Sequence, residues 1–317
     1  MAVVIQTRGK FDETFHPFSV VAVGTDGSTQ GIGPARLTPW RSAAKPFQLA
    51  TSLELLGDPL LSPQQLAVGA ASHSAEPVHV ELVESLLARF GFTIEQLRCG
   101  AHAPMHGSSA RAVIQSGQKF SNIHNNCSGK HTFMLAAAAA QGWALDYRPP
   151  DHPLQQAILG RVHGWAQTSV DTALDGCGVP TFCLTLAGIA QAWHLLALCM
   201  KDDRDPRLGA IGRAMAAHPE LTSGTGRFDL QLTKIANESM AVKVGAQGVF
   251  CLALPERGLG LAVKVHSGAA EALAAAVVFA LQQYAPGSVT VPEEWDPLLV
   301  RNVVGAIAGS YKVQAED

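Results

Sequence analysis

The sequence predicts an α+β protein in which strands from both ends of the chain form an antiparallel sheet flanked by helices, with a mainly helical region inserted between them. Val20 to Val23, followed by the turn residues Thr25-Asp26-Gly27-Ser28, indicates the first arm of a hairpin. The last third of the chain holds three strand-like runs separated by glycine-bearing turns, at Ala241 to Gly245, Val249 to Ala253 and Leu259 to Val265. These runs do not alternate regularly with helices as in a doubly wound parallel sheet, so we expect antiparallel pairing.

The middle of the chain carries helical patterns. After Arg41-Ser42, apolar residues recur at helical spacing until Gly57-Asp58-Pro59 ends them. Another helix should begin after Ser128, because His131 to Trp143 contains five consecutive alanines and closes on Gln141-Gly142. Further helices are expected at Val78 to Phe90, Pro153 to Val170, Thr185 to Met200, Arg207 to Ala217 and Ala269 to Tyr284. We expect one domain over residues 1–317, its sheet built from about residues 1–40 and 240–317.

The composition favours a small molecule as the partner. Of the 317 residues 47% are hydrophobic, the formal net charge is only -3, and no cluster of lysine and arginine is present. Neither nucleic acid nor a membrane surface is therefore expected to bind. Residues 1–12 lack the pattern of an export signal, and the most apolar later segments are shorter than a membrane span. Six scattered cysteines form no disulfide framework, so we expect a reduced, cytoplasmic protein.

A thiol and an amine lie three residues apart in Cys127-Ser128-Gly129-Lys130, at the start of the alanine-rich helix. The two side chains share one helix face, and the positive end of the helix favours the thiolate that binds metal. Asp175-Gly176-Cys177 offers a third ligand. Lysine is a rare ligand because it must lose its proton, so a buried cysteine beside a surface lysine is the alternative.

Two lysines stand where a serine hydrolase would need them. Ser42-Ala43-Ala44-Lys45 places a hydroxyl and an amine one helical turn apart, although Ser42 could instead cap the helix. Lys243-Val244-Gly245 resembles the KTG element that accompanies SxxK in penicillin-binding proteins and serine β-lactamases, with Lys264 as an equivalent strand lysine. Ser116-Gly117-Gln118-Lys119 also matches SxxK, in a poorly periodic segment, so this spacing alone is weak evidence.

The segment Ala71-Ser72-His73-Ser74-Ala75-Glu76 gathers two hydroxyls, an imidazole and a carboxylate in a short turn. Such clusters usually cap a helix, here the one that begins near Pro77. His131 has no matching carboxylate or histidine nearby in the sequence, and a satisfied core histidine is its default interpretation.

Taken together, these segments resemble the bacterial L-asparaginase II family of the rhizobial type. The resemblance runs from about Glu13 to Gly268 and rests on five ordered motifs: Arg41 to Gln48, Ala71-Ser72-His73, Asn126 to His131, Asp175-Gly176-Cys177 and Lys243 to Ala246. It implies a fold similar to serine β-lactamases and penicillin-binding proteins, a homodimer, and hydrolysis of L-asparagine to aspartate and ammonia.

The resemblance also implies roles for individual residues. Ser42 with Lys45, and Ser72 with Lys243, become two neighbouring Ser-Lys pairs, with Ser42 as the nucleophile. A zinc ion would be held by Cys127, Lys130, Cys177 and a water molecule. Arg41, His131 and Asp175 become candidates for binding the substrate or surrounding the metal.

One departure from the family pattern concerns the pocket rim, where Ser223-Gly224-Thr225-Gly226 lacks the acidic residue often found between the glycines. Two other functions stay open at this point: a β-lactamase-like serine hydrolase of another amide, and a non-catalytic protein that binds zinc or an amino acid. The two Ser-Lys pairs favour catalysis.

Overall fold

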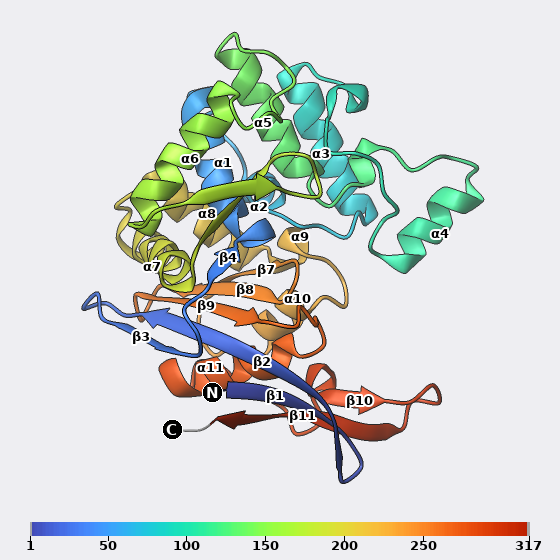
Figure 1. The fold of residues 1–317 in the computed structure, drawn as a ribbon. Coiled ribbons are helices and arrows are strands. Elements are labelled where there is room, and N and C mark those ends of the chain that lie inside the picture. The colour runs from blue at the N-terminus through green and yellow to red at the C-terminus, as the bar shows by residue number, and fades with distance from the viewer. Residues whose placement is uncertain (1, 316–317) are drawn as a thin grey trace.

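The computed structural model describes residues 2–315 and contains one large antiparallel sheet. Its strand order is β10-β11-β1-β2-β9-β8-β7, with β3 paired to β2 outside this path. The strands come from both ends of the chain, as predicted (Figure 1). Their bounds are β1 (Ala2–Arg8), β2 (Phe11–Val23), β3 (Thr29–Ile32), β7 (Ala241–Gly245), β8 (Val249–Leu254), β9 (Leu259–Val265), β10 (Leu299–Arg301) and β11 (Ile307–Ala315).

Helices fill the middle of the chain and cover both faces of the sheet. They are α1 (Lys45–Leu56), α2 (Pro63–Gly69), α3 (Pro77–Phe90), α4 (Gly107–Gln115), α5 (Ser128–Ala140), α6 (Pro153–Ala166), α7 (Leu186–Asp202), α8 (Pro206–Ala217), α9 (Pro219–Thr222), α10 (Phe228–Lys234) and α11 (Leu273–Tyr284). The α+β class and the inserted helical region are therefore confirmed.

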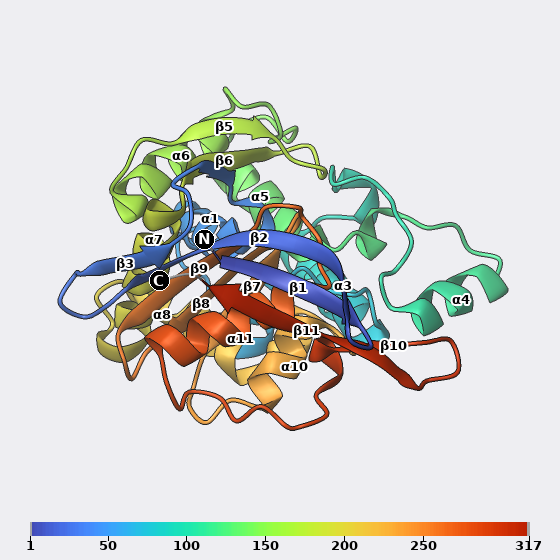
Figure 2. The same cartoon turned by 60° about the horizontal axis from the view of Figure 1, so that its bottom comes forward.

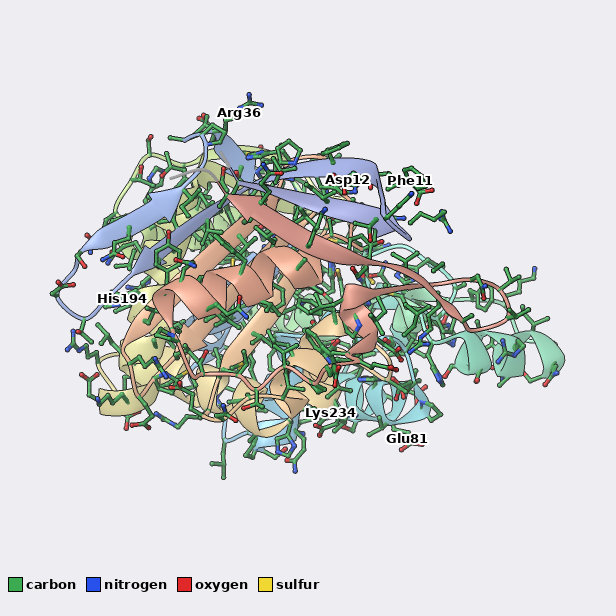
Figure 3. All side chains as sticks on the ribbon, turned by 90° about the horizontal axis from the view of Figure 1, so that it is seen from below. Phe11, Asp12, Arg36, Glu81, His194 and Lys234 are labelled. Carbon is green, nitrogen blue, oxygen red and sulfur yellow. The ribbon has the colours of Figure 1, made fainter. Side chains whose placement is uncertain are left out.

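The two-residue period of β9 explains how the sheet holds a helix on each face. Leu261 and Val263 point into the apolar cluster that contains α11. Ala262 lies in the other cluster, with α7. Gly260 lets α7 approach closely, because a Cβ atom there would meet the backbone nitrogen of His194 at 2.0 Å. Figure 3 looks onto the α11 side.

The centre of the helical region is α5, in which Ser128 to Ala138 are all buried. Its small residues allow close packing against α1 and α2. Gly129 is required by this contact, since a Cβ atom there would meet the carbonyl oxygen of Val68 at 2.2 Å. The predicted alanine-rich helix is thus confirmed, and it lies buried in the core of the helical region.

Several elements were not predicted from the sequence. A separate three-stranded sheet has the order β4-β6-β5, with β4 (Leu37–Pro39), β5 (Asp171–Leu174) and β6 (Pro180–Thr185), and lies apart from the main sheet (Figure 2). The helix α4 projects from the body and buries no residue (Figure 1). Two predicted bounds were also too wide: α6 ends at Ala166, where Gln167 adopts a left-handed conformation, and α11 begins at Leu273.

Within residues 2–315, no helix is both long enough and apolar enough to cross a bilayer. All six cysteines are free thiols.

Candidate active site

The hydroxyl-bearing residues Ser42 and Ser72 line the same cavity of about 440 Å³. Ser42 lies in the 3-10 turn Arg41–Ala44 that leads into α1, and Ser72 lies in the loop after α2. The rest of the wall comes from the loops before α4 and α5, the loop before α10 with the start of that helix, the end of β7 with the turn to β8, and the start of α11. A second cavity, of about 460 Å³, is lined largely by leucines and prolines near Asp58 and Arg207 and holds none of the predicted site residues.

Lys45 is the first residue of α1 and is only 1% exposed. Its Nζ donates to the carbonyl oxygen of Ala71 at 2.6 Å, to Oγ of Ser72 at 2.8 Å and to the carbonyl oxygen of Asn126 at 3.3 Å. Ser72 is therefore a hydrogen-bonded partner of Lys45, and the predicted pairing of Ser72 with Lys243 stays a prediction. Burial lowers the pKa of Lys45, and the nearby ammonium of Lys130 adds to that shift.

The hydroxyl of Ser42 does not cap the helix, which was the alternative to a catalytic role. Trp40 occupies the N-cap position of the 3-10 turn and Ala44 that of α1, and neither makes a side-chain capping bond. Ser42 is partly exposed, and in a 3-10 turn residues three apart lie on the same side, so Ser42 and Lys45 share one face. The hydroxyl of Ser42 is left available to a ligand in the cavity.

Lys243 lies fully buried on β7, and its Nζ donates to the carbonyl oxygen of Val244 at 2.9 Å. Burial, followed by the charge of Lys45, holds the pKa of Lys243 well below its usual range. The rival Lys264 does not line the cavity and donates instead to the carbonyl oxygens of Gln247 and Val265.

The segment Ala71 to Glu76 caps α3 through its last residue, as its alternative interpretation expected, but Ser72 takes no part in the cap. Glu76 is the N-cap residue, and its backbone N–H donates to Nδ1 of His79 at 3.1 Å. His73 is fully buried, and its Nε2 lies 2.9 Å from Oγ of Ser128. The loop that carries Ser72 is thereby fixed to the start of α5.

The three predicted zinc ligands lie together in the interior. Cys127, Lys130 and Cys177 are 6%, 2% and 7% exposed, and Nζ of Lys130 lies 3.3 Å from Sγ of Cys177. The hydrogen bond from Cys177, aided by the charges of Lys45 and Lys130, holds the pKa of Cys127 well below its usual range. Burial opposes a charge on Lys130, but the two cysteines and Asp175 outweigh it and raise its pKa.

Two thiols and an amine that converge in a buried place form a donor set that fits a zinc ion, provided that the protons leave when the metal binds. Among residues 2–315, no group of three or more histidine, cysteine, aspartate and glutamate side chains is arranged to hold a metal. The amine of Lys130 would therefore have to serve as the third protein ligand.

Arg41 and Asp175 form an ion pair, with Nη2 of Arg41 2.8 Å from Oδ1 of Asp175. Arg41 has a left-handed backbone conformation (φ 53°), which the ion pair and a bond from its N–H to Oγ1 of Thr181 at 3.0 Å help to hold. In this structure Arg41 therefore pairs with a carboxylate of the protein, that of Asp175. The pair fixes the turn of Cys177 against the turn of Ser42.

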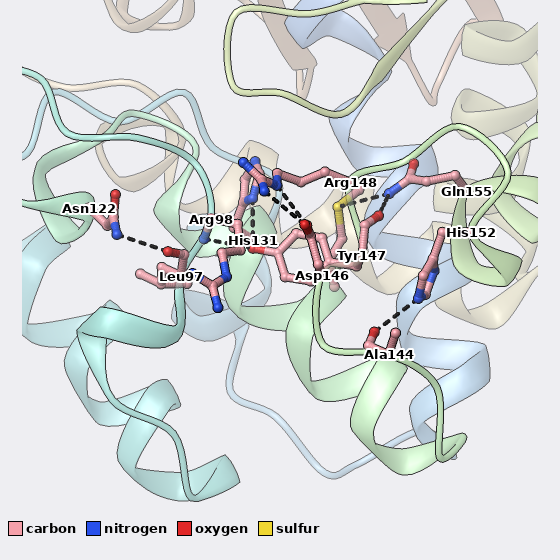
Figure 4. A network of polar contacts seen from close by, with 11 residues as sticks. Leu97, Arg98, Asn122, His131, Ala144, Asp146, Tyr147, Arg148, His152 and Gln155 are labelled. Carbon is pink, nitrogen blue, oxygen red and sulfur yellow. Dashed lines mark hydrogen bonds and ion pairs between the residues drawn. The ribbon is translucent and has the colours of Figure 1, made fainter.

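His131 lies outside the cavity lining and belongs to a buried network around Tyr147 (Figure 4). The hydroxyl of Tyr147 accepts from the backbone N–H of Arg98 at 3.2 Å and lies 2.8 Å from Nδ1 of His131. Nε2 of His131 has no hydrogen-bond partner among residues 2–315. Burial holds the pKa of His131 well below its usual range, so the ring is neutral. This placement supports a structural role.

Four polar residues of the cavity were missed in the sequence: Asn126, Arg227, Asp229 and Gln247. Asn126 belonged to a motif but received no role. Arg227 and Asp229 follow the segment Ser223 to Gly226, which was expected to shape the pocket rim; Gly226 does line the cavity. The sequence did contain one signal for Arg227 and Asp229: an arginine and an aspartate lie close together just after Gly224 and Gly226.

Among solved structures, the chain is similar to two β-lactamases. The β-lactamase from Burkholderia vietnamiensis is 19% identical over 83% of this chain and 89% of that chain, with a TM-score of 0.39. The enzyme from Streptomyces albus G is 20% identical over 80% of this chain and 88% of that chain, with a TM-score of 0.38. At this low similarity they say nothing of activity.

The sequence model of the L-asparaginase II family matches residues 4–312, which is nearly the whole chain. The chain therefore belongs to the L-asparaginase II family, as its motifs predicted, and to the class of asparaginase-type amidohydrolases. A search of curated proteins returned no match.

Proposed function

We propose that this protein is an L-asparaginase that hydrolyses L-asparagine to L-aspartate and ammonia by a serine-lysine mechanism. The observation that carries the proposal is the cavity that both Ser42 and the buried Ser72 line, with Ser72 hydrogen-bonded to the buried amine of Lys45. Family membership supports the substrate class.

Ser42 is the proposed nucleophile. Its Oγ attacks the carbon of the side-chain amide while its proton passes to the neutral amine of Lys45, directly or through Ser72. The backbone N–H groups at the start of a helix have no intrahelical partner, so those near Ser42 are suited to the developing oxyanion. The C–N bond then breaks, the nitrogen takes up a proton from Lys45 and leaves as ammonia, and an ester to Ser42 remains.

A water molecule completes the cycle. It loses a proton to a lysine amine as its oxygen attacks the ester carbon, the bond to Oγ breaks, and Ser42 recovers its proton as aspartate leaves. The lowered pKa values of Lys45 and Lys243 favour this role, because an amine accepts a proton only when it is neutral.

We further propose that Cys127, Lys130 and Cys177 hold a zinc ion. When bound, the metal would act as a Lewis acid that helps to orient the substrate, while the two thiolates would balance its charge. The ion pair between Arg41 and Asp175 would keep the turn of Cys177 in place. We also propose a cytoplasmic homodimer, which light scattering would test by showing the mass of two chains.

Ammonia release from asparagine and from glutamine tests the proposed function, with zinc quantified in the same preparations. Ser42→Ala should lower kcat at least ~10³-fold, since removal of a nucleophile is among the most damaging changes to such an enzyme. Ser116→Ala is the matched control, because Ser116 stands in a second SxxK segment and donates only to the carbonyl oxygen of Val113.

Absence of turnover with either amide, across a broad range of pH and zinc concentration, would refute the asparaginase. Covalent labelling of Ser42 by penicillin without ammonia release would instead support a β-lactam-reactive hydrolase.

A further inference from the structure

The cavity that contains Ser42 carries one positive and one negative side chain. Arg227 and Asp229 are the charged residues of its lining within residues 2–315. The charged groups of a free amino acid also comprise one carboxylate and one ammonium. The two side chains could therefore recognise the α-carboxylate and the α-ammonium of the substrate, which take no part in the hydrolysis.

The guanidinium of Arg227 has no carboxylate partner. None of the ion pairs among residues 2–315 involves it, and its side chain donates to the sulfur of Met105 at 3.2 Å. By contrast, Arg41, which precedes Ser42 in the chain, is already paired with Asp175. A guanidinium presents two parallel N–H groups that match a carboxylate, so an unpaired one in an active-site wall is suited to an anionic ligand.

The backbone holds Arg227 firmly in this place. Its N–H donates to the carbonyl oxygen of Gly224 at 3.2 Å, and its own carbonyl oxygen accepts from the N–H of Gln231 at 3.0 Å in the first turn of α10. The loop before it is fixed as well, because Oγ1 and the N–H of Thr225 both donate to the carboxylate of Glu76 at 2.8 Å. A ligand therefore meets a fixed backbone.

Asp229 does not neutralise Arg227. It is 2% exposed, its Oδ1 accepts from the hydroxyl of Ser223, and its Oδ2 has no partner among residues 2–315. Lys243 lies near enough to feel its charge but donates to the carbonyl oxygen of Val244 instead. An uncompensated carboxylate in a poorly solvated wall attracts a cation strongly through its field.

We propose that Arg227 binds the α-carboxylate of the substrate and that the charge of Asp229 favours its α-ammonium, which restricts the enzyme to free amino acids. The inference rests on the proposed function for the identity of the reacting amide. It disfavours amides that lack the α-carboxylate and asparagine residues within peptides, because neither presents both charges.

Calorimetry with L-asparagine on Ser42→Ala protein tests the inference, because this background holds the ligand without turnover. Adding Arg227→Gln should weaken binding about ten- to a hundredfold, since a charge-assisted hydrogen bond is lost. Binding of 3-aminopropanamide, in which hydrogen replaces the α-carboxylate, should be the same with and without Arg227→Gln. The asparagine affinity of Arg227→Lys should lie between that of the Ser42→Ala background and that of Arg227→Gln, because lysine keeps the positive charge but lacks the two parallel N–H groups of the guanidinium.

Arg111→Gln is the matched control, since Arg111 lies on the projecting helix α4 and donates to Ser108 at 3.0 Å. Melting temperatures of all variants verify that they fold. Unchanged asparagine binding in Arg227→Gln would overturn the inference, as would equal weakening of both ligands or no asparagine binding at all.

The two proposals can fail separately. A wild-type protein that binds asparagine through Arg227 but releases no ammonia would refute the asparaginase and leave the recognition site standing. Turnover of asparagine with a KM that is indifferent to Arg227→Gln would do the opposite.

Discussion

A stacked pair of buried histidines, His73 and His79, should make the protein lose stability as the pH falls through 6.5. Their ring centroids are 5.2 Å apart and the planes are inclined by 13°. Each Nδ1 accepts a backbone N–H, from Ala75 at 3.2 Å and from Glu76 at 3.1 Å. Each Nε2 faces an oxygen atom, of Ser128 at 2.9 Å and of Glu220 at 3.0 Å. Both rings are therefore held neutral, and a second proton would have to displace an N–H donor.

The sign of the effect follows from the lowered pKa values. Burial, followed by the charge of His79, holds the pKa of His73 well below 6.5; burial also lowers that of His79, although Glu220 and Glu76 oppose the shift. Below pH 6.5 the unfolded chain binds protons that the folded chain refuses, so acid favours unfolding. The stability contributed by these rings is complete above pH 6.5 and is lost toward their native pKa values.

The magnitude follows from proton linkage. A histidine with an unfolded pKa of 6.5 and a native pKa far below 5.5 lowers the free energy of unfolding by about 1.4 kcal/mol between pH 7.5 and 5.5. His73, whose pKa is held well below 6.5, should therefore cost up to about 1.4 kcal/mol, and His79, whose pKa is lowered against opposing carboxylates, should add a smaller loss. His131, whose pKa is also held well below its usual range by burial, adds to this loss.

Urea unfolding at pH 7.5, 6.5 and 5.5, followed by circular dichroism on chelated protein, measures the slope. His79→Asn should reduce the loss over this range, because asparagine keeps an acceptor for the N–H of Glu76 and takes up no proton. His163→Gln is the control, since His163 is exposed on α6. A wild-type stability that is constant from pH 7.5 to 5.5, or a slope that His79→Asn leaves unchanged, would refute the reasoning.

Two further predictions concern packing and catalysis. Gly129→Ala should lower the free energy of unfolding by about 1–3 kcal/mol through overpacking against Val68, whereas Gly160→Ala, at an open helical site, should raise it by about 0.5–1 kcal/mol; equal effects in urea unfolding would contradict the close contact. Lys45→Met should lower ammonia release by at least ~10²-fold while the circular dichroism spectrum stays native, and Lys264→Met, the rival strand lysine, should leave the rate unchanged; comparable losses in both would remove Lys45 from its proposed role.

The sequence predicted those elements whose signals are local. The helix that became α1 has regular apolar spacing and ends at Gly57, which takes the left-handed conformation (φ 82°) that suits glycine. By contrast, β1 was missed although it forms a hairpin with its neighbour in sequence, β2, with Ala2 opposite Phe18. Its second partner, β11, lies at the other end of the chain, with Ala2 opposite Ala315, and no window of sequence contains that pairing.

The same limit applies to the site. The types of residue were predictable, since serine, lysine and cysteine occur in motifs with helical or strand spacing. Their partners were not, because the bond from Lys45 to Ser72 joins residues 27 positions apart and depends on how the loop after α2 meets α1. Arg227 was missed for the same reason: nothing in its local sequence shows that it lacks a carboxylate partner.

Three buried lysine amines lie at the site, and their surroundings shift their pKa values differently. Lys130 lies beside two cysteines that raise its pKa, so it is a cation wherever no metal takes its lone pair. Lys45 faces three oxygen atoms but is desolvated, which leaves its pKa lowered and its proton movable. Burial holds the pKa of Lys243 well below its usual range, so this amine is readily left neutral. A gradient of basicity across one small volume is what proton transfer between a serine, an amide nitrogen and water requires, since each step needs one group that gives a proton and another that accepts it.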